Sequence, residues 1–86
     1  MNRALLGQRL RERREQAGWS QAAIAQQAGI TQGDLSLLER GQKHVWVDTL
    51  LRLADALGCS LDYLTGRTED PTTPVKRPRP RPAPVG

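Results

Sequence analysis

Three times in this chain, a glycine that can end a helix is followed two residues later by a serine or threonine that can begin the next one. These pairs are Gly18 with Ser20, Gly29 with Thr31, and Gly58 with Ser60. Glycine readily adopts the left-handed conformation that closes a helix, and a Ser or Thr hydroxyl accepts a hydrogen bond from a free N–H group at a helix start. The pattern therefore predicts a series of short helices.

Apolar side chains recur at helical spacing inside these segments. The segment from Leu5 to Gly18 predicts an amphipathic helix, and the segment from Ser20 to about Ala28 predicts a second helix with a narrow apolar stripe. Small side chains in that stripe let neighbouring helices approach closely. The positions expected to face the core are Leu6, Leu10 and Ala17 in the first helix and Ala23, Ile24 and Ala28 in the second.

Three more helices are expected in the chain up to residue 66. Thr31 can cap one that ends near Gly41. A loop over residues 42–46 then leads into the central core helix, and a short helix, Leu61–Leu64, comes last. The core helix is the most apolar segment, with Val47, Leu50, Leu51, Leu53, Ala54 and Leu57.

Aromatic residues are scarce, which narrows the fold class. The 86 residues include no Phe, one Tyr and two Trp, so the core has to be built from Leu, Ala, Val and Ile. Such a core suits tightly packed short helices better than aromatic-rich strands, and a domain this small buries only ~60% of the surface of its unfolded chain. We therefore expect an all-α, five-helix domain over residues 1–66.

Residues 67–86 differ in composition and are expected to form a disordered, basic, proline-rich tail. All six prolines lie there, and such a stretch favours extended polyproline II structure over helix. The tail carries a net charge of +3, whereas residues 1–66 carry only +1. Arg77, Arg79 and Arg81 alternate with proline, so the tail could follow DNA phosphates or serve only as a solubilising segment.

Residues 20–41 are expected to form two short helices joined by a glycine-containing turn, the second helix capped by Thr31. This is the pattern of a helix-turn-helix, whose second helix enters the major groove of DNA, a groove about 12 Å wide. The turn signals alone fit an ordinary helical hairpin equally well.

Positions spread over all five segments favour the DNA-binding interpretation. About three quarters of the chain resembles the lambda-repressor-like helix-turn-helix family, of the Cro or xenobiotic-response-element type. The resemblance implies a regulator of transcription, typically a repressor, that binds palindromic operator DNA as a dimer. The residues that carry it are Leu6-Gly7, Leu10-Arg11, Ser20-Gln21, Ile24-Ala25, Gly29, Leu35, Glu39-Arg40-Gly41, Thr49-Leu50-Leu51, Leu53-Ala54, Ala56-Leu57-Gly58, Ser60-Leu61-Asp62, Leu64 and Gly66.

The resemblance also implies roles for individual residues. Gln21 corresponds to a residue that contacts a phosphate and steadies the base-reading side chain. Gln32 corresponds to the main base reader, whose amide can pair with adenine N6 and N7. Arg14 and Glu39 stand where the family often has a structural ion pair. The further candidates for DNA contact are Thr31, Gly33, Asp34, Ser36, Leu37, Lys43, His44 and Arg11.

Several of these candidates have a second explanation. Asp34 could accept a hydrogen bond from cytosine N4, but it also stands at the reciprocal position of a capping box, which explains it without DNA. Gly33 cannot read a base with a side chain. Leu37 could touch a thymine methyl group or be merely exposed, and His44 could contact a phosphate or be solvated. The operator sequence is therefore left open.

Two further features allow alternative interpretations. A run of cations in the first helix could reach the DNA backbone or form a solvated face, and comprises Arg9, Arg11 and Arg13. Trp46 stands where the family usually has a capping Ser or Thr, so the fourth helix is expected to lack its cap. Trp46 itself could anchor a dimer or partner surface, or fold back over the core. Trp19 is expected to plug the core between the first two helices, and Cys59 is expected to be buried rather than reactive.

The chain offers little for catalysis. With one His and one Cys, it can assemble no convincing catalytic or metal-binding constellation, so we expect no enzyme activity, metal or cofactor. No apolar run is long enough to cross a membrane, and a lone Cys59 forms no internal disulfide, which together predict a cytoplasmic, nucleoid-associated protein. The alternative function is an antitoxin-like or other protein-interaction module on the same fold.

Overall fold

The computed structural model describes residues 2–70, and all regular structure within that range is helical. This confirms the expected all-α, five-helix class. The predicted tail beyond residue 70 lies outside the described residues. The helices are α1 (Arg3–Gln16), α2 (Gln21–Ala28), α3 (Gln32–Glu39), α4 (Val47–Leu57) and α5 (Leu61–Leu64).

The cap residues act as the sequence predicts. The hydroxyl oxygens of Ser20, Thr31 and Ser60 accept hydrogen bonds from the backbone N–H groups three residues later, at 3.1, 3.0 and 3.0 Å. The glycine before each cap has a positive φ, which only glycine adopts without strain. The first helix starts earlier than expected, at Arg3, because the Asn2 side chain caps it.

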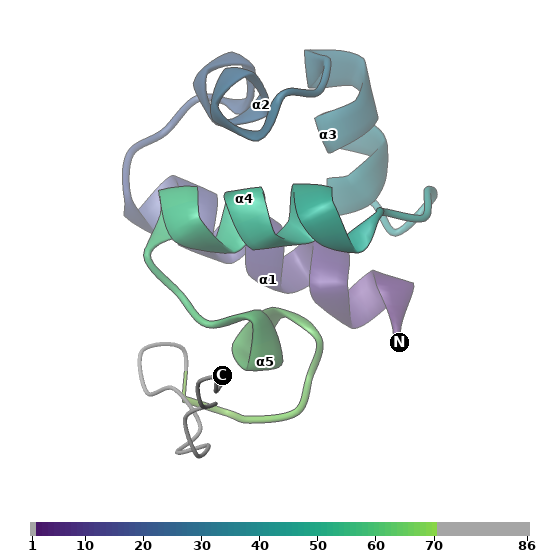
Figure 1. Cartoon of the computed structure of the whole chain (residues 1–86), viewed down its shortest axis with the longest axis vertical. Coiled ribbons are helices and arrows are strands. Elements are labelled where there is room, and N and C mark those ends of the chain that lie inside the picture. The colour runs from purple at the N-terminus through teal and green to yellow at the C-terminus, as the bar shows by residue number, and fades with distance from the viewer. Residues whose placement is uncertain (1, 71–86) are drawn as a thin grey trace, which may run out of the picture.

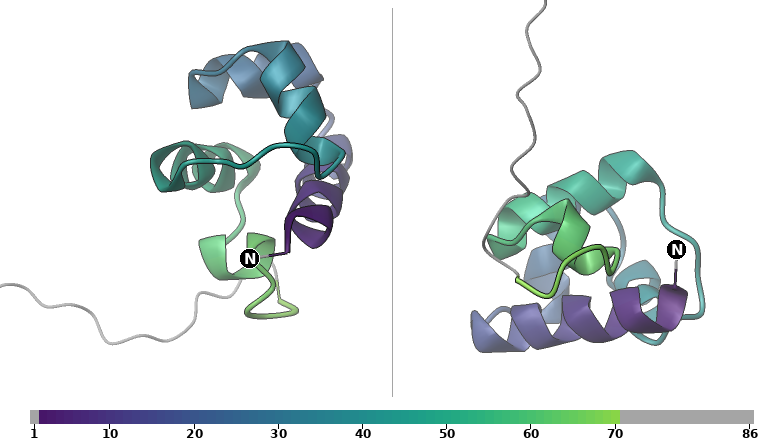
Figure 2. Two further views of the ribbon diagram at one scale, coloured as in Figure 1. Left: turned by 90° about the vertical axis from the view of Figure 1, so that its right-hand side faces the viewer. Right: turned by 90° about the horizontal axis from the view of Figure 1, so that it is seen from below.

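The helices enclose a small aliphatic core. Helix α4 crosses the middle of the molecule beside α1, with α2 and α3 at one end and α5 at the other (Figures 1 and 2). Helix α4 packs against α1, α2 and α5, in agreement with the central place predicted for it. The buried apolar residues are Leu6, Leu10, Ile24, Ala25, Ala28, Leu35, Leu38, Leu50, Leu53, Ala54, Leu57 and Leu64.

Four of the predicted core positions are wrong. Ala17 caps the C-terminus of α1 and is exposed, and Ala23 is only half-buried while its neighbour Ala25 is buried. On α4, Val47 and Leu51 are exposed. These helices thus bury fewer of their apolar residues than their composition suggests, because only residues directly opposite a neighbouring helix can be covered.

Residues 67–70 pack against the helical domain through Arg9. Its guanidinium donates hydrogen bonds to the carbonyl oxygens of Tyr63 and Thr68, at 2.5 and 2.9 Å, and lies 4.1 Å from the centroid of the Tyr63 ring. It also pairs with Glu69 at 3.2 Å. No helix within residues 2–70 is long and apolar enough to cross a membrane.

Candidate nucleic-acid interface

Helices α2 and α3, joined by the turn at Gly29, form one end of the molecule (Figure 1). The buried face of α3 carries Leu35 and Leu38, which pack into the core. Its first turn projects Gln32 and Gly33 into solvent. Helix α3 is therefore fixed by its apolar face and presents a polar, accessible N-terminus.

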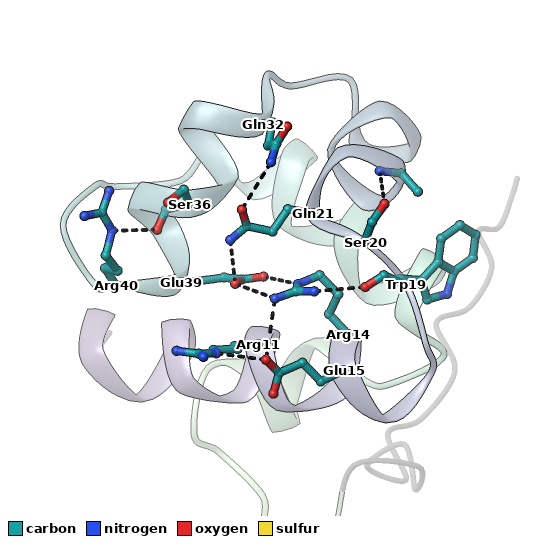
Figure 3. Close-up of polar contacts among 11 residues, drawn as sticks. Arg11, Arg14, Glu15, Trp19, Ser20, Gln21, Gln32, Ser36, Glu39 and Arg40 are labelled. Carbon is teal, nitrogen blue, oxygen red and sulfur yellow. Dashed lines mark hydrogen bonds and ion pairs between the residues drawn. The ribbon is translucent and has the colours of Figure 1, made fainter.

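A chain of polar contacts connects the exposed end of α3 to α1 (Figure 3). The amide nitrogen of Gln32 lies 3.5 Å from the amide oxygen of Gln21, whose own nitrogen donates to Glu39 Oε1 at 3.0 Å. Arg14 donates to both carboxylate oxygens of Glu39, at 2.6 and 3.1 Å, and to the Trp19 carbonyl oxygen at 2.9 Å. These contacts place Gln21 beside Gln32, as the family resemblance implies.

The carboxylate at the base of this chain sets the direction of every amide in it. Because an ionised Glu39 can only accept, Gln21 must turn its NH₂ group toward it and its oxygen toward Gln32. Gln32 then directs an NH₂ group at Gln21. Its own amide oxygen has no partner among the described residues, so it is available to an incoming donor such as an adenine amino group.

The Arg14–Glu39 pair is confirmed as a buried link between α1 and the end of α3. The side chains are only 11% and 3% exposed. The hydrogen bond with Glu39 raises the pKa of Arg14 above its ordinary value, against the opposing effect of burial. The guanidinium therefore stays charged, and its removal from water is offset by the bidentate contact.

Asp34, in the first turn of α3, pairs with Lys43 in the loop that follows α3. The Asp34 backbone N–H bonds to the Thr31 hydroxyl, which is one half of the predicted capping box. The Asp34 carboxylate is 3.7 Å from the Lys43 ammonium group, and no bond from it to the Thr31 N–H is found in residues 2–70. The second half of the predicted capping box is thus replaced by an ion pair with the loop.

The loop between α3 and α4 brings further predicted residues next to α3. Lys43 and His44 are exposed, and with Asp34 and Trp46 they line a shallow depression of about 220 Å³. Ser36 and Leu37 on α3 are half-buried. Nine of the ten predicted contact residues are therefore on α1, α2, α3 or this loop, Thr31 is the N-cap of α3, and none of the ten is fully buried.

On the other side of α3, Arg11 and Arg40 flank a second depression of about 230 Å³ that also contains Gln21 and Ser36 (Figure 3). Arg11 pairs with the exposed Glu15 at 3.1 Å, and Arg40 donates to the Ser36 carbonyl oxygen at 3.3 Å. Arg40 was not among the residues predicted from the sequence to contact DNA. Its place at the C-terminus of α3 was the available signal.

The other two cations of the predicted basic run face the protein. Arg9 is buried beneath α5, and Arg13 donates to the Leu57 carbonyl oxygen at the end of α4, at 3.5 Å. The prediction that they could reach the DNA backbone is therefore wrong for Arg9 and Arg13. Helical periodicity places them on the side of α1 that α4 and α5 cover.

Trp46 is 83% exposed, so the expectation that it could fold back over the core is wrong. It precedes α4 without a side-chain cap, as predicted. Val47 and Leu51, one helical turn apart, are exposed beside it. We call Trp46, Val47 and Leu51 the Trp46 patch.

Residues 2–70 offer few other side chains that could react or bind a metal ion. Cys59 and Trp19 pack against the core, as expected, but are only half-buried, and burial raises the pKa of the Cys59 thiol despite the opposing charge of Arg13. Residues 2–70 contain no group of three or more His, Cys, Asp or Glu side chains that could hold a metal ion.

Comparison with known proteins gives a consistent result. The model of the helix-turn-helix domain family matches residues 5–65. The HTH-type transcriptional regulator ImmR of Bacillus subtilis (strain 168) is 41% identical over 64 residues, covering 74% of this chain and 50% of that protein. Repressor protein C2 of Salmonella phage P22 is 39% identical over 64 residues, covering 74% of this chain and 30% of that protein. The chain thus spans half or less of the length of these two relatives.

Solved structures show the same similarity. The crystal structure of the P22 c2 repressor in complex with a synthetic operator has a TM-score of 0.68 and 38% identity, covering 70% of this chain and 91% of that chain. The clp gene regulator ClgR of Corynebacterium glutamicum has a TM-score of 0.73 and 33% identity, covering 78% of this chain and 71% of that chain.

Proposed function

Because the chain belongs to the helix-turn-helix domain family, we propose that it is a transcription regulator, typically a repressor, that binds operator DNA by placing α3 in the major groove. The family resemblance expected from the sequence is confirmed. One observation carries the mechanism: the exposed amide of Gln32 is oriented by Gln21, which is oriented in turn by the buried Glu39.

Gln32 acts in this proposal as the main base reader. Its free amide oxygen accepts from adenine N6, and its NH₂ group, which has two hydrogens, donates one to Gln21 and the other to adenine N7. The side chain therefore enters the groove with its orientation already set. Preorganisation of this kind lowers the entropy lost on binding.

The residues around α3 position the helix on the DNA backbone. Arg11 and Arg40 on one side, and Lys43 and His44 on the other, are exposed and polar. Contacts of such groups with phosphates fix the register of the protein without carrying sequence information. These four residues are the candidates for phosphate contact, together with Gln21 at the start of α2.

We also propose that the protein binds a palindromic site as a homodimer through the Trp46 patch. Trp46 of this patch adjoins Lys43 and His44, since these three residues line the same depression. The side chains of the patch are apolar apart from the indole N–H of Trp46, and a second copy on the neighbouring half-site would cover them. Two-fold symmetry would then match the two halves of the operator.

Selection from a randomised duplex library tests the function. The protein is expected to enrich a palindromic site, and Gln32→Ala is expected to weaken binding to that site by ~1–3 kcal/mol while leaving binding to random DNA nearly intact. Gln26→Ala, an exposed change on α2, is the control. Equal losses on both DNAs would contradict base reading by Gln32.

The same selection separates this proposal from a protein-interaction module. A partner-binding domain on this fold would enrich no site and would bind DNA through charge alone. The proposed role requires binding and not catalysis, and it places the protein at the nucleoid in the cytoplasm.

A further inference from the structure

Nothing in the structure of the free protein requires a glycine at residue 33, the second residue of α3. Of the glycines in residues 2–70, those at 18, 29, 41, 58 and 66 have a positive φ, which explains each of them. Gly7 lies where α1 meets α3, and a Cβ atom there would collide with the carbonyl oxygens of Leu38 and Glu39. Only Gly33 is left unexplained by either conformation or packing.

The surroundings of Gly33 would accept a side chain. Its backbone is helical, and a Cβ atom would meet only the Thr31 hydroxyl oxygen, at 3.9 Å, which is an ordinary van der Waals contact. Glycine weakens a helix relative to alanine because it loses more conformational freedom on folding. The folded domain would therefore be more stable with alanine at this position.

The position of Gly33 indicates why the absence of a side chain matters there. It follows Gln32 directly on the exposed first turn of α3. The Thr31 hydroxyl takes the Asp34 N–H, while the N–H of Gly33 has no partner within the described residues, as expected for the second residue of a helix. Gly33 thus exposes bare backbone, with a free donor, beside the side chain proposed to read a base.

We propose that Gly33 determines how closely the recognition helix approaches the bases, and so is a specificity residue that acts by the absence of a side chain. Without Cβ, the backbone of the first turn lies against a base edge in the major groove. A side chain at residue 33 would hold the helix away and pull Gln32 out of reach of adenine. This inference rests on the proposed function.

The test compares stability with DNA binding in the same variants. Gly33→Ala is expected to raise the melting temperature of the free protein by up to about 4–8 °C. It is also expected to weaken binding to the selected operator about tenfold or more, with little change on random DNA. Gly33→Val should weaken operator binding further because its side chain is larger. Gln26→Ala should leave both affinities unchanged.

Each outcome has a distinct meaning. If Gly33→Ala binds the operator as tightly as the natural protein, the glycine has no role in recognition and the inference is wrong. If it loses operator and random binding equally and melts no higher, the effect comes from the fold and the inference is again wrong. If the natural protein itself does not distinguish operator from random DNA, the proposed function fails instead.

Discussion

Glu39 has two roles at the level of single residues. It neutralises the nearly buried Arg14, and it orients the amides of Gln21 and Gln32. Because it accepts hydrogen bonds from both sides, stability and the proposed reading of DNA depend on the same carboxylate. A residue that looks purely structural can therefore affect specificity through its polarity.

Replacing Glu39 with Ala is expected to lower the free energy of unfolding by ~3–5 kcal/mol, because the Arg14 guanidinium stays buried without its partner. Chemical denaturation measures the loss. Glu12→Ala is the matched control, since Glu12 is exposed on α1 and its hydrogen bond with Gln8 is on the surface. An unchanged midpoint for Glu39→Ala would mean that the pair is solvated in solution.

At the level of helices, the contact between α1 and α3 depends on Gly7. Its missing side chain lets the two backbones approach until the carbonyl oxygens of Leu38 and Glu39 occupy the space of a Cβ atom. This close contact brings Arg14 on α1 within reach of Glu39 on α3. The orientation of α3 therefore starts from a glycine in another helix.

Gly7→Ala is expected to destabilise the domain by about 1–3 kcal/mol, although alanine is the better helix former, because the added methyl group forces the helices apart. Thermal unfolding of the two variants, measured side by side, tests this. The melting temperature is expected to fall for Gly7→Ala and to rise for Gly33→Ala. A higher melting temperature for Gly7→Ala would show that the two helices pack less closely than described.

At the level of the whole molecule, the Trp46 patch is the exposed apolar surface that a dimer would cover. Trp46→Ser is expected to abolish self-association in sedimentation experiments. The folded state should not suffer, because serine supplies the missing cap of α4, an effect of ~0.5–2 kcal/mol. A natural protein that stays monomeric, both free and on its operator, would rule out the proposed dimer.

The charges beyond residue 70 are expected to add affinity without specificity. Lys76, Arg77, Arg79 and Arg81 supply up to four phosphate contacts per chain. Removing residues 71–86 should therefore flatten the slope of log K against log salt concentration by up to roughly 4 per chain. Anisotropy titrations on operator and random DNA measure both this slope and the ratio of the two affinities. A collapse of the ratio would mean that this segment reads sequence.

Local chemistry in the sequence was sufficient to place the helices. The capping hydroxyls of Ser20, Thr31 and Ser60, and the glycines before them, act through atoms only a few residues away, so neighbouring residues reveal them. The family resemblance, carried by residues along most of the chain, identified α3, Gln21 and Gln32 as candidates for DNA contact.

The tertiary structure alone decided the burial of residues that hydrophobic periodicity does not assign, above all the cations of α1. Arg9 and Arg11 are two residues apart and have the same side chain, yet Arg9 is buried against Tyr63 and Thr68 while Arg11 is exposed. The partners of Arg9 lie more than 50 residues away, and the surroundings of Trp46 and Gly33 likewise depend on how the helices pack. The burial of these residues depends on surfaces that come together only on folding, so neighbouring residues in the sequence could not specify it.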